Sequence, residues 1–228
     1  MNHQPRAKTI IRAQTADEEF DYLIKVLHKL DFYKTNGYPI PIPDHPLFLS
    51  IVNNPHILDT FDRDEARAAF TRDIYDCNFI ENGLKTIKNH GSLIEKAMER
   101  MKNRETWWFK MFPLYQITLT AFGPGGSYDF RRGIIIMKTK ETWNFGRVPY
   151  HTIIYEIIHI GIEECIVKKF ELTHSEKEWL VDSICVHCFH DVLTDYRVQE
   201  RGDADVFRLV SQDNIMDLPH NIRQYKKK

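Results

Sequence analysis

The stretch Pro149-Tyr-His-Thr-Ile-Ile-Tyr-Glu-Ile-Ile-His-Ile-Gly-Ile-Glu163 belongs to the most apolar helical segment of the chain. It predicts a helix over residues 150 to about 170. Residues four apart lie on one face of a helix, so Tyr155 and His159 address the same point, with Glu156 beside them. Because a carboxylate inside so apolar a helix is costly unless it is paired or coordinated, Glu156 indicates a functional site.

A second helix is expected after a short interruption. Thr173 is followed three residues later by Glu176, which matches a capping box at the start of a helix. We therefore expect a helix over residues 174 to about 195. It carries two acids, Glu178 and Asp182, which lie one turn apart and share a face.

Two extended segments precede these helices. Residues 115–122, Tyr-Gln-Ile-Thr-Leu-Thr-Ala-Phe, alternate apolar and polar positions and are rich in β-branched and aromatic residues, which predicts a strand. Extended character resumes over residues 133–137, Gly-Ile-Ile-Ile-Met. Gly123-Pro-Gly-Gly126 ends the first strand, and residues 127–132 are expected to continue the loop. The pattern predicts an antiparallel pair of strands joined by a long loop.

The N-terminal part is expected to be mainly helical. Apolar residues recur at helical spacing over residues 16–30, and further helices are predicted over residues 62–79 and 92–103. The expected fold class is therefore α+β, with N-terminal helices first, then a small antiparallel sheet, then the helix pair.

Length and composition indicate one folded domain. The chain has 228 residues, of which 43% are hydrophobic, enough for a sizeable core. We expect a single domain over residues 1–228. It comprises a mainly helical part (1–110), the sheet with the helix pair (111–200) and a C-terminal tail (201–228).

The segment Tyr155-Glu-Ile-Ile-His159 resembles the active-site helix of the zincin superfamily of metallopeptidases, which has the pattern H-E-x-x-H. The resemblance implies Zn²⁺ as cofactor, Glu156 as the general base and His159 as the second metal ligand. Tyr155 stands where the first His ligand is expected. A phenol with a pKa of about 10 must lose its proton before it binds a metal, so this replacement weakens the implied site.

The second helix extends the resemblance. Its Glu178-Trp-Leu-Val-Asp182 is similar to the E-x-x-x-D of the thermolysin-like (gluzincin) branch, which implies Glu178 as the third ligand and Asp182 as a supporting residue. A geometric estimate differs, because a turn centred near residue 171.5 brings Asp182 closer than Glu178 to the level of His159. Both acids remain candidates, with Glu178 only marginally ahead. The resemblance also implies an edge strand that binds substrate backbone, either 115–122 or 133–137.

Two functions from different classes follow from these residues. The first is a metallopeptidase-like, metal-dependent hydrolase, with Glu156 as general base and the metal held by His159 and by Glu178 or Asp182, with Tyr155 as a further candidate ligand. The alternative is a catalytically inactive zincin-fold protein that acts as a binding or interaction module. In either case the expected partner is a peptide or a protein. Ordinary helix residues without a site are the third interpretation.

Charge and hydropathy limit the other partners. The chain has 31 Lys and Arg against 32 Asp and Glu, a formal net charge of −1, which disfavours nucleic acid because phosphate binding requires a basic excess. No stretch approaches the roughly 18 apolar residues of a membrane span. Residues 1–12 contain no apolar run typical of a signal peptide, so we expect a soluble cytoplasmic protein. Four cysteines are too few for a disulfide scaffold of this length, and they are expected to remain thiols. No oligomeric state is predicted.

Overall fold

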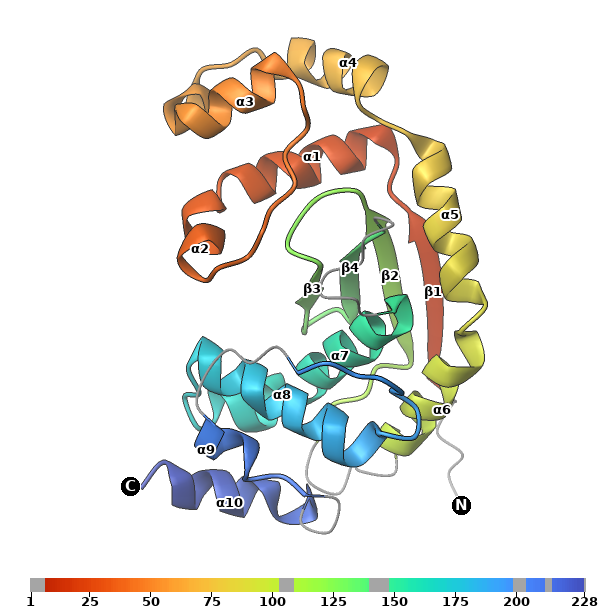
Figure 1. Cartoon of the computed structure of the whole chain (residues 1–228), viewed down its shortest axis with the longest axis vertical. Coiled ribbons are helices and arrows are strands. Elements are labelled where there is room, and N and C mark those ends of the chain that lie inside the picture. Colours follow the sequence, from red (N-terminus) through yellow and green to blue (C-terminus); the bar gives the residue numbers. More distant parts are fainter. Residues whose placement is uncertain (1–6, 103–108, 140–147, 199–203, 212–214, 228) are drawn as a thin grey trace.

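The computed structural model describes residues 7–102, 109–139, 148–198, 204–211 and 215–227. Its centre is a four-stranded sheet (Figure 1) whose strands lie in the order β1-β2-β4-β3. The strands are β1 (Lys8–Ala13), β2 (Leu114–Thr120), β3 (Gly126–Asp129) and β4 (Ile134–Lys138).

The sheet is mixed, and the expected antiparallel pair is wrong. Both predicted strands exist, but β2 and β4 are parallel, with Ile117 opposite Ile135. The chain returns between them through β3, which pairs antiparallel with the outer side of β4. Two parallel neighbouring strands cannot be joined by a tight turn, because the chain must first run back along the sheet. Here β3 makes that return between β2 and β4. β3 lies within the segment expected to be a loop, where four residues give no periodic signal. β1, which was not predicted, pairs parallel with β2.

The N-terminal helices differ from the expectation at two breaks. The helix expected over residues 16–30 is α1 (Ala16–Leu27), followed directly by the short α2 (Leu30–Thr35). The helix expected over 62–79 is two helices, α4 (Arg63–Asp73) and α5 (Cys77–Lys88). The break between α4 and α5 occurs because the Asp76 side chain accepts a hydrogen bond from the Asn78 N–H and caps a new helix. The remaining elements of this part are α3 (Pro46–Asn53), the 3₁₀ turn η1 (Pro55–Asp59) and α6 (Gly91–Lys102).

The C-terminal helix pair is confirmed. α7 spans Pro149–Ile162 and continues into a π-helical segment, η4 (Glu163–Lys168). α8 spans His174–Phe189 and begins with the predicted capping box, although it ends earlier than expected. The tail adds α9 (Ala204–Phe207), η5 (Ile215–Asp217) and α10 (Leu218–Tyr225).

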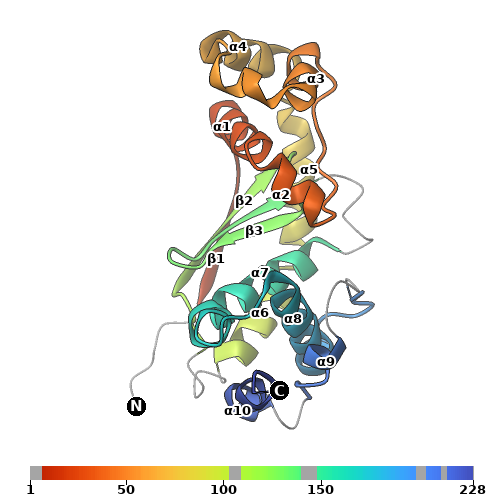
Figure 2. The same ribbon diagram turned by 90° about the vertical axis from the view of Figure 1, so that its left-hand side faces the viewer.

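Two apolar clusters hold these elements together. The larger one joins the sheet to α5, α6, α7 and α8, and includes Ile117, Ile135, Ile157 and Leu180. The smaller one joins α1, α3 and α4 through residues such as Phe20. In both views α3 and α4 lie at one end and α10 at the other, with the sheet between them (Figures 1 and 2). Within the described ranges, no helix has the length and apolar character needed to cross a membrane.

Candidate functional site

A cavity of about 420 Å³ lies beside the edge strand β3. Four parts of the chain enclose it: the α2 region, the glycine-rich turn leading into β3, the helix α7 and the start of α8. Its lining residues are Lys29, Phe32, Tyr33, Tyr38, Pro124, Gly125, Gly126, Ser127, Tyr128, Thr152, Tyr155, Glu156, His159, His174, Lys177 and Glu178.

The helix α7 brings three of the predicted site residues to this cavity. Tyr155, Glu156 and His159 all line it, although each is at most 6% exposed. The rings of Tyr155 and His159, four residues apart, meet edge to face with centroids 4.6 Å apart. Ile153, Ile157 and the other isoleucines of α7 are buried in the core. Their packing determines which face of the helix points toward the cavity.

Glu156 lies against the backbone of the edge strand. A Cβ atom added at Gly126 would be 2.1 Å from Oε1 of Glu156, far inside van der Waals contact. Only a residue without a side chain therefore allows this carboxylate to approach β3 so closely. The edge strand at the site is β3, whereas 115–122 and 133–137 form the interior strands β2 and β4.

Glu178 crosses from α8 to the residues of α7. Its Oε2 accepts a 2.9 Å hydrogen bond from the Tyr155 hydroxyl, and its Oε1 lies 3.6 Å from His159 Nε2. Asp182 is also buried but does not line the cavity, and its carboxylate accepts a hydrogen bond from the Tyr196 hydroxyl.

The π-helical segment is one departure from the regular helix geometry that favoured Asp182. A π-helix closes its hydrogen bonds over five residues instead of four, so η4 advances less along its axis than a regular α-helix of the same length. Counting residues at α-helical rise therefore overestimates the distance from His159 to the turn. That difference is small over the six residues of η4, so the packing of α8 across α7 decides that Glu178, and not Asp182, reaches His159.

Three nitrogen atoms surround Oε1 of Glu178. His159 Nε2 and Lys177 Nζ are each 3.6 Å away, and His174 Nδ1 is 3.7 Å away. Burial alone would raise the pKa of Glu178, but His159, Lys177 and His174 outweigh it and hold the pKa below its ordinary value. Glu178 is therefore an ionised carboxylate in a buried site.

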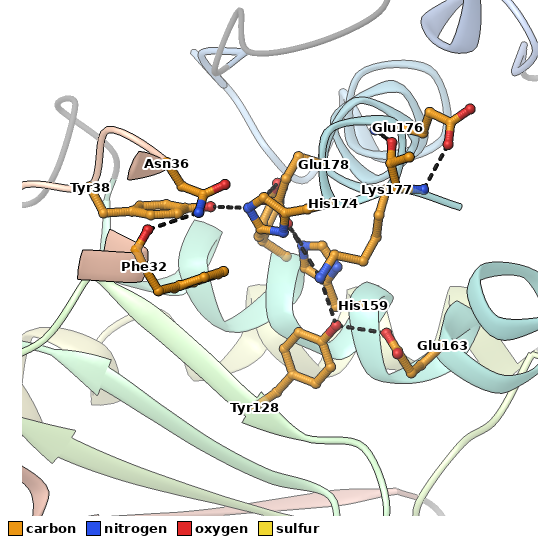
Figure 3. A network of polar contacts seen from close by, with 12 residues as sticks. Phe32, Asn36, Tyr38, Tyr128, His159, Glu163, His174, Glu176, Lys177 and Glu178 are labelled. Carbon is orange, nitrogen blue, oxygen red and sulfur yellow. Dashed lines mark hydrogen bonds and ion pairs between the residues drawn. The ribbon is translucent and has the colours of Figure 1, made fainter. Parts of the chain in front are cut away.

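Lys177 is held by a hydrogen-bond chain that the sequence did not indicate (Figure 3). Its ammonium donates to the Tyr128 hydroxyl at 3.2 Å, and that hydroxyl donates to Glu163 at 2.8 Å. The Tyr128 ring stacks on His159 with centroids 5.2 Å apart. Tyr128 lies in β3, within the expected loop, so no sequence signal pointed to its place in the site.

An aromatic wall, formed by Phe32, Tyr33 and Tyr38 of the α2 region, lines another side of the cavity. The Tyr38 hydroxyl and His174 Nε2 share a 2.7 Å hydrogen bond across it (Figure 3). Phe32 also meets the His174 ring edge to face, yet remains 51% exposed. Burial lowers the pKa of His174, and the net shift is downward although Glu178 favours the charged form. These aromatic residues follow the end of α1 and carried no motif.

The residues present fit a divalent metal poorly. His159 Nε2 and Glu178 Oε1 are 3.6 Å apart, close to the separation of about 3.3 Å expected for two ligands of one tetrahedral zinc ion. The third candidate ligand, however, is the phenol of Tyr155, which donates a hydrogen bond to Glu178. The Lys177 ammonium also lies 3.6 Å from Glu178 Oε1 and would repel a metal ion there. Among the described residues, no group of three or more His, Cys, Asp and Glu side chains is placed to hold a metal ion.

Comparison with known proteins adds no assignment: no protein-family model matches the chain, and neither the curated proteins nor the solved structures contain a significant match.

Proposed function

We propose that this protein is a non-catalytic, zincin-like binding module whose cavity receives an extended segment of a peptide or protein. The observation that carries the proposal is the pairing of Glu178 within the protein. Its carboxylate accepts a hydrogen bond from Tyr155 and forms an ion pair with Lys177. A buried carboxylate that is neutralised in this way needs no metal ion.

Among the described residues no strand pairs with the outer edge of β3, and this edge supports an extended ligand. The Lys138 N–H donates to the Gly125 carbonyl, one residue before the pair Gly126–Met137 with which the register of β3 and β4 begins. Hydrogen-bonded and non-hydrogen-bonded pairs alternate along antiparallel strands, so the main-chain groups of Gly126 and Tyr128 point away from β4. Both residues line the cavity. A peptide strand can therefore add to this edge through its own backbone.

The cavity lining gives such a strand room for side chains. Phe32, Tyr33 and Tyr38 form one wall, and the buried Glu156 lies beside the glycine of the edge strand. Aromatic rings contribute large apolar contact area at low entropic cost, which favours recognition of a peptide with apolar or aromatic side chains.

A metal-dependent peptidase remains the second candidate. One observation favours it: Tyr155, Glu156, His159 and Glu178 all line the same cavity. In that proposal Glu156 is the general base, and His159, Glu178 and Tyr155 bind the metal. The poor fit of Tyr155 and Lys177 to a cation makes it the weaker of the two.

Selection from a randomised peptide library, in the presence of a chelator, tests the binding function. We expect enrichment of peptides that bind without metal and remain intact after zinc is added. In a selected peptide, N-methylation of alternate amides should abolish binding, while N-methylation of the intervening amides should have little effect, because only every second N–H of an added strand faces β3. No enrichment, or cleavage of bound peptides with zinc, would count against the proposal. Zinc content near one per chain after metal-replete purification would favour the peptidase.

A further inference from the structure

The environment of Glu178 Oε1 contains an ammonium group as well as two imidazoles. We infer that Lys177 is the built-in cation of this site, which takes the place of a divalent metal at Glu178 and excludes metal from the cavity. The inference concerns the exclusion of metal ions, and it does not depend on whether the cavity binds a peptide.

Lys177 differs in kind from the two imidazoles at Glu178 Oε1. An imidazole nitrogen is a common metal ligand, whereas a lysine ammonium is a compact point charge with three N–H donors and no acceptor, so it repels a metal ion instead of binding it. The Lys177 side chain is only 16% exposed, and the Glu178 side chain only 11%. The pair is therefore shielded from the solvent that screens ion pairs at the surface.

The position of the ammonium is fixed by its neighbours. It hydrogen-bonds the Tyr128 hydroxyl and lies 5.5 Å from the centroid of the Tyr128 ring. Tyr128 is in turn held by Glu163 and by its stacking on His159. Moving Lys177 away from Glu178 would break contacts with both Glu178 and Tyr128, so the charge stays at the carboxylate.

A metal shared by His159 and Glu178 would meet this charge directly. An ion bound about 2 Å from Oε1 would lie beside an ammonium that is itself 3.6 Å from the same oxygen. Repulsion between the two cations, together with loss of the lysine ion pair, opposes binding. Restoring a histidine at position 155 alone should therefore not restore a strong metal site.

Zinc affinity in two variants tests the inference, measured by competition with a chromophoric chelator at neutral pH. We expect Tyr155→His to bind zinc weakly and Tyr155→His/Lys177→Met to bind it at least about tenfold tighter, which corresponds to one decade of affinity. Tyr155→His/Lys177→Arg keeps the charge and should bind as weakly as Tyr155→His.

A second lysine serves as the matched control. Lys110 also pairs with a glutamate, Glu164, at 3.1 Å, but the pair is more exposed and neither residue lines the cavity. Tyr155→His/Lys110→Met should bind zinc no better than Tyr155→His. The inference is overturned if Tyr155→His and Tyr155→His/Lys177→Met bind zinc with equal affinity. One tightly bound zinc per chain in the unaltered protein would also overturn it.

Loss of folding in the methionine variant would still be informative. Lys177→Met leaves Glu178 without its ammonium, and zinc should then raise the melting temperature of the variant more than that of the unaltered protein. If Tyr155→His/Lys177→Met is unfolded without metal, it should refold when zinc is added. Failure of zinc to stabilise either variant would contradict the inference.

Discussion

The Tyr155 hydroxyl donates a 2.9 Å hydrogen bond to Glu178 Oε2 and thereby joins α7 to α8 at the wall of the cavity. In the zincin-like interpretation both side chains would face a metal, whereas here they face each other. The phenol has the length to reach the carboxylate directly and a proton to donate. Two residues that this interpretation takes as candidate ligands are thus a hydrogen-bonded pair.

Removal of that hydroxyl should destabilise the fold more than removal of an ordinary one. Tyr155→Phe is expected to lower the free energy of unfolding by about 1.5–3 kcal/mol, the range for hydrogen bonds to charged groups. Tyr150 is the matched control, since it lies on the same helix, is equally buried at 3% and donates to the Val192 carbonyl at 3.0 Å. Tyr150→Phe should cost about 1 kcal/mol. Urea unfolding of both variants checks this, and a smaller loss for Tyr155→Phe would contradict an ionised Glu178.

A methyl group at Gly126 should displace Glu156. Because the added Cβ would be 2.1 Å from Glu156 Oε1, Gly126→Ala is expected to cost about 1–3 kcal/mol of stability and to weaken peptide binding at β3. Gly91 provides the control, since a Cβ there meets nothing within 4 Å. Gly91→Ala should leave binding unchanged and stabilise α6 by about 0.4–1 kcal/mol. Equal stabilities of the two variants would argue against the close approach of Glu156 to the strand.

Glu19 should make stability fall as pH rises. It is buried between α1 and the end of β2, where the Thr120 hydroxyl and the Ala121 N–H donate hydrogen bonds to its carboxyl group. Burial raises the pKa of Glu19 from 4.5 to about 7, despite these hydrogen bonds. The native state thus keeps a proton that the unfolded state releases above about pH 4.5. The corresponding stabilisation is complete below that pH and is lost as pH rises through 7, a change of about 3 kcal/mol.

Urea unfolding between pH 4 and pH 8 measures this change. Glu19→Gln keeps the acceptor oxygen and carries no charge, so its stability should vary less with pH and exceed that of the unaltered protein at pH 8. Glu65→Gln, at an exposed position of α4, is the control and should leave the pH dependence as it is. A Glu19→Gln variant with an unchanged profile would contradict the raised pKa.

The Tyr38–His174 hydrogen bond should restrain the aromatic wall. Tyr38→Phe removes the 2.7 Å contact across the cavity, with an expected loss of about 0.5–1.5 kcal/mol and faster hydrogen exchange in α2. Tyr33→Phe alters the same wall but keeps that contact, and should leave exchange in α2 nearly unchanged. Equal exchange rates in the two variants would show that the bond does not hold the wall in place.

The sequence predicted the elements of the site better than their arrangement. The apolar spacing around Tyr155 and His159 and the capping box at Thr173 depend on neighbours in the chain, so the starts of α7 and α8 were predicted to within one residue, whereas both α-helices end earlier than expected. The direction of β4 was predicted wrongly, because the intervening β3 has no periodic signal of its own. Lys177 and Tyr128 were missed for a related reason: each becomes part of the site through a partner distant in the chain.

The sequence by itself determined which side chains share a face of α7, because helical periodicity is local and is fixed by the buried isoleucines. It also determined that an acid-bearing helix follows. Only the tertiary structure decided that Glu178 reaches the cavity while Asp182 meets Tyr196, and that the Lys177 ammonium lies beside Glu178. These outcomes depend on how far η4 advances and on how α8 packs across α7, and such relations between elements are set by packing rather than by the order of residues within either helix.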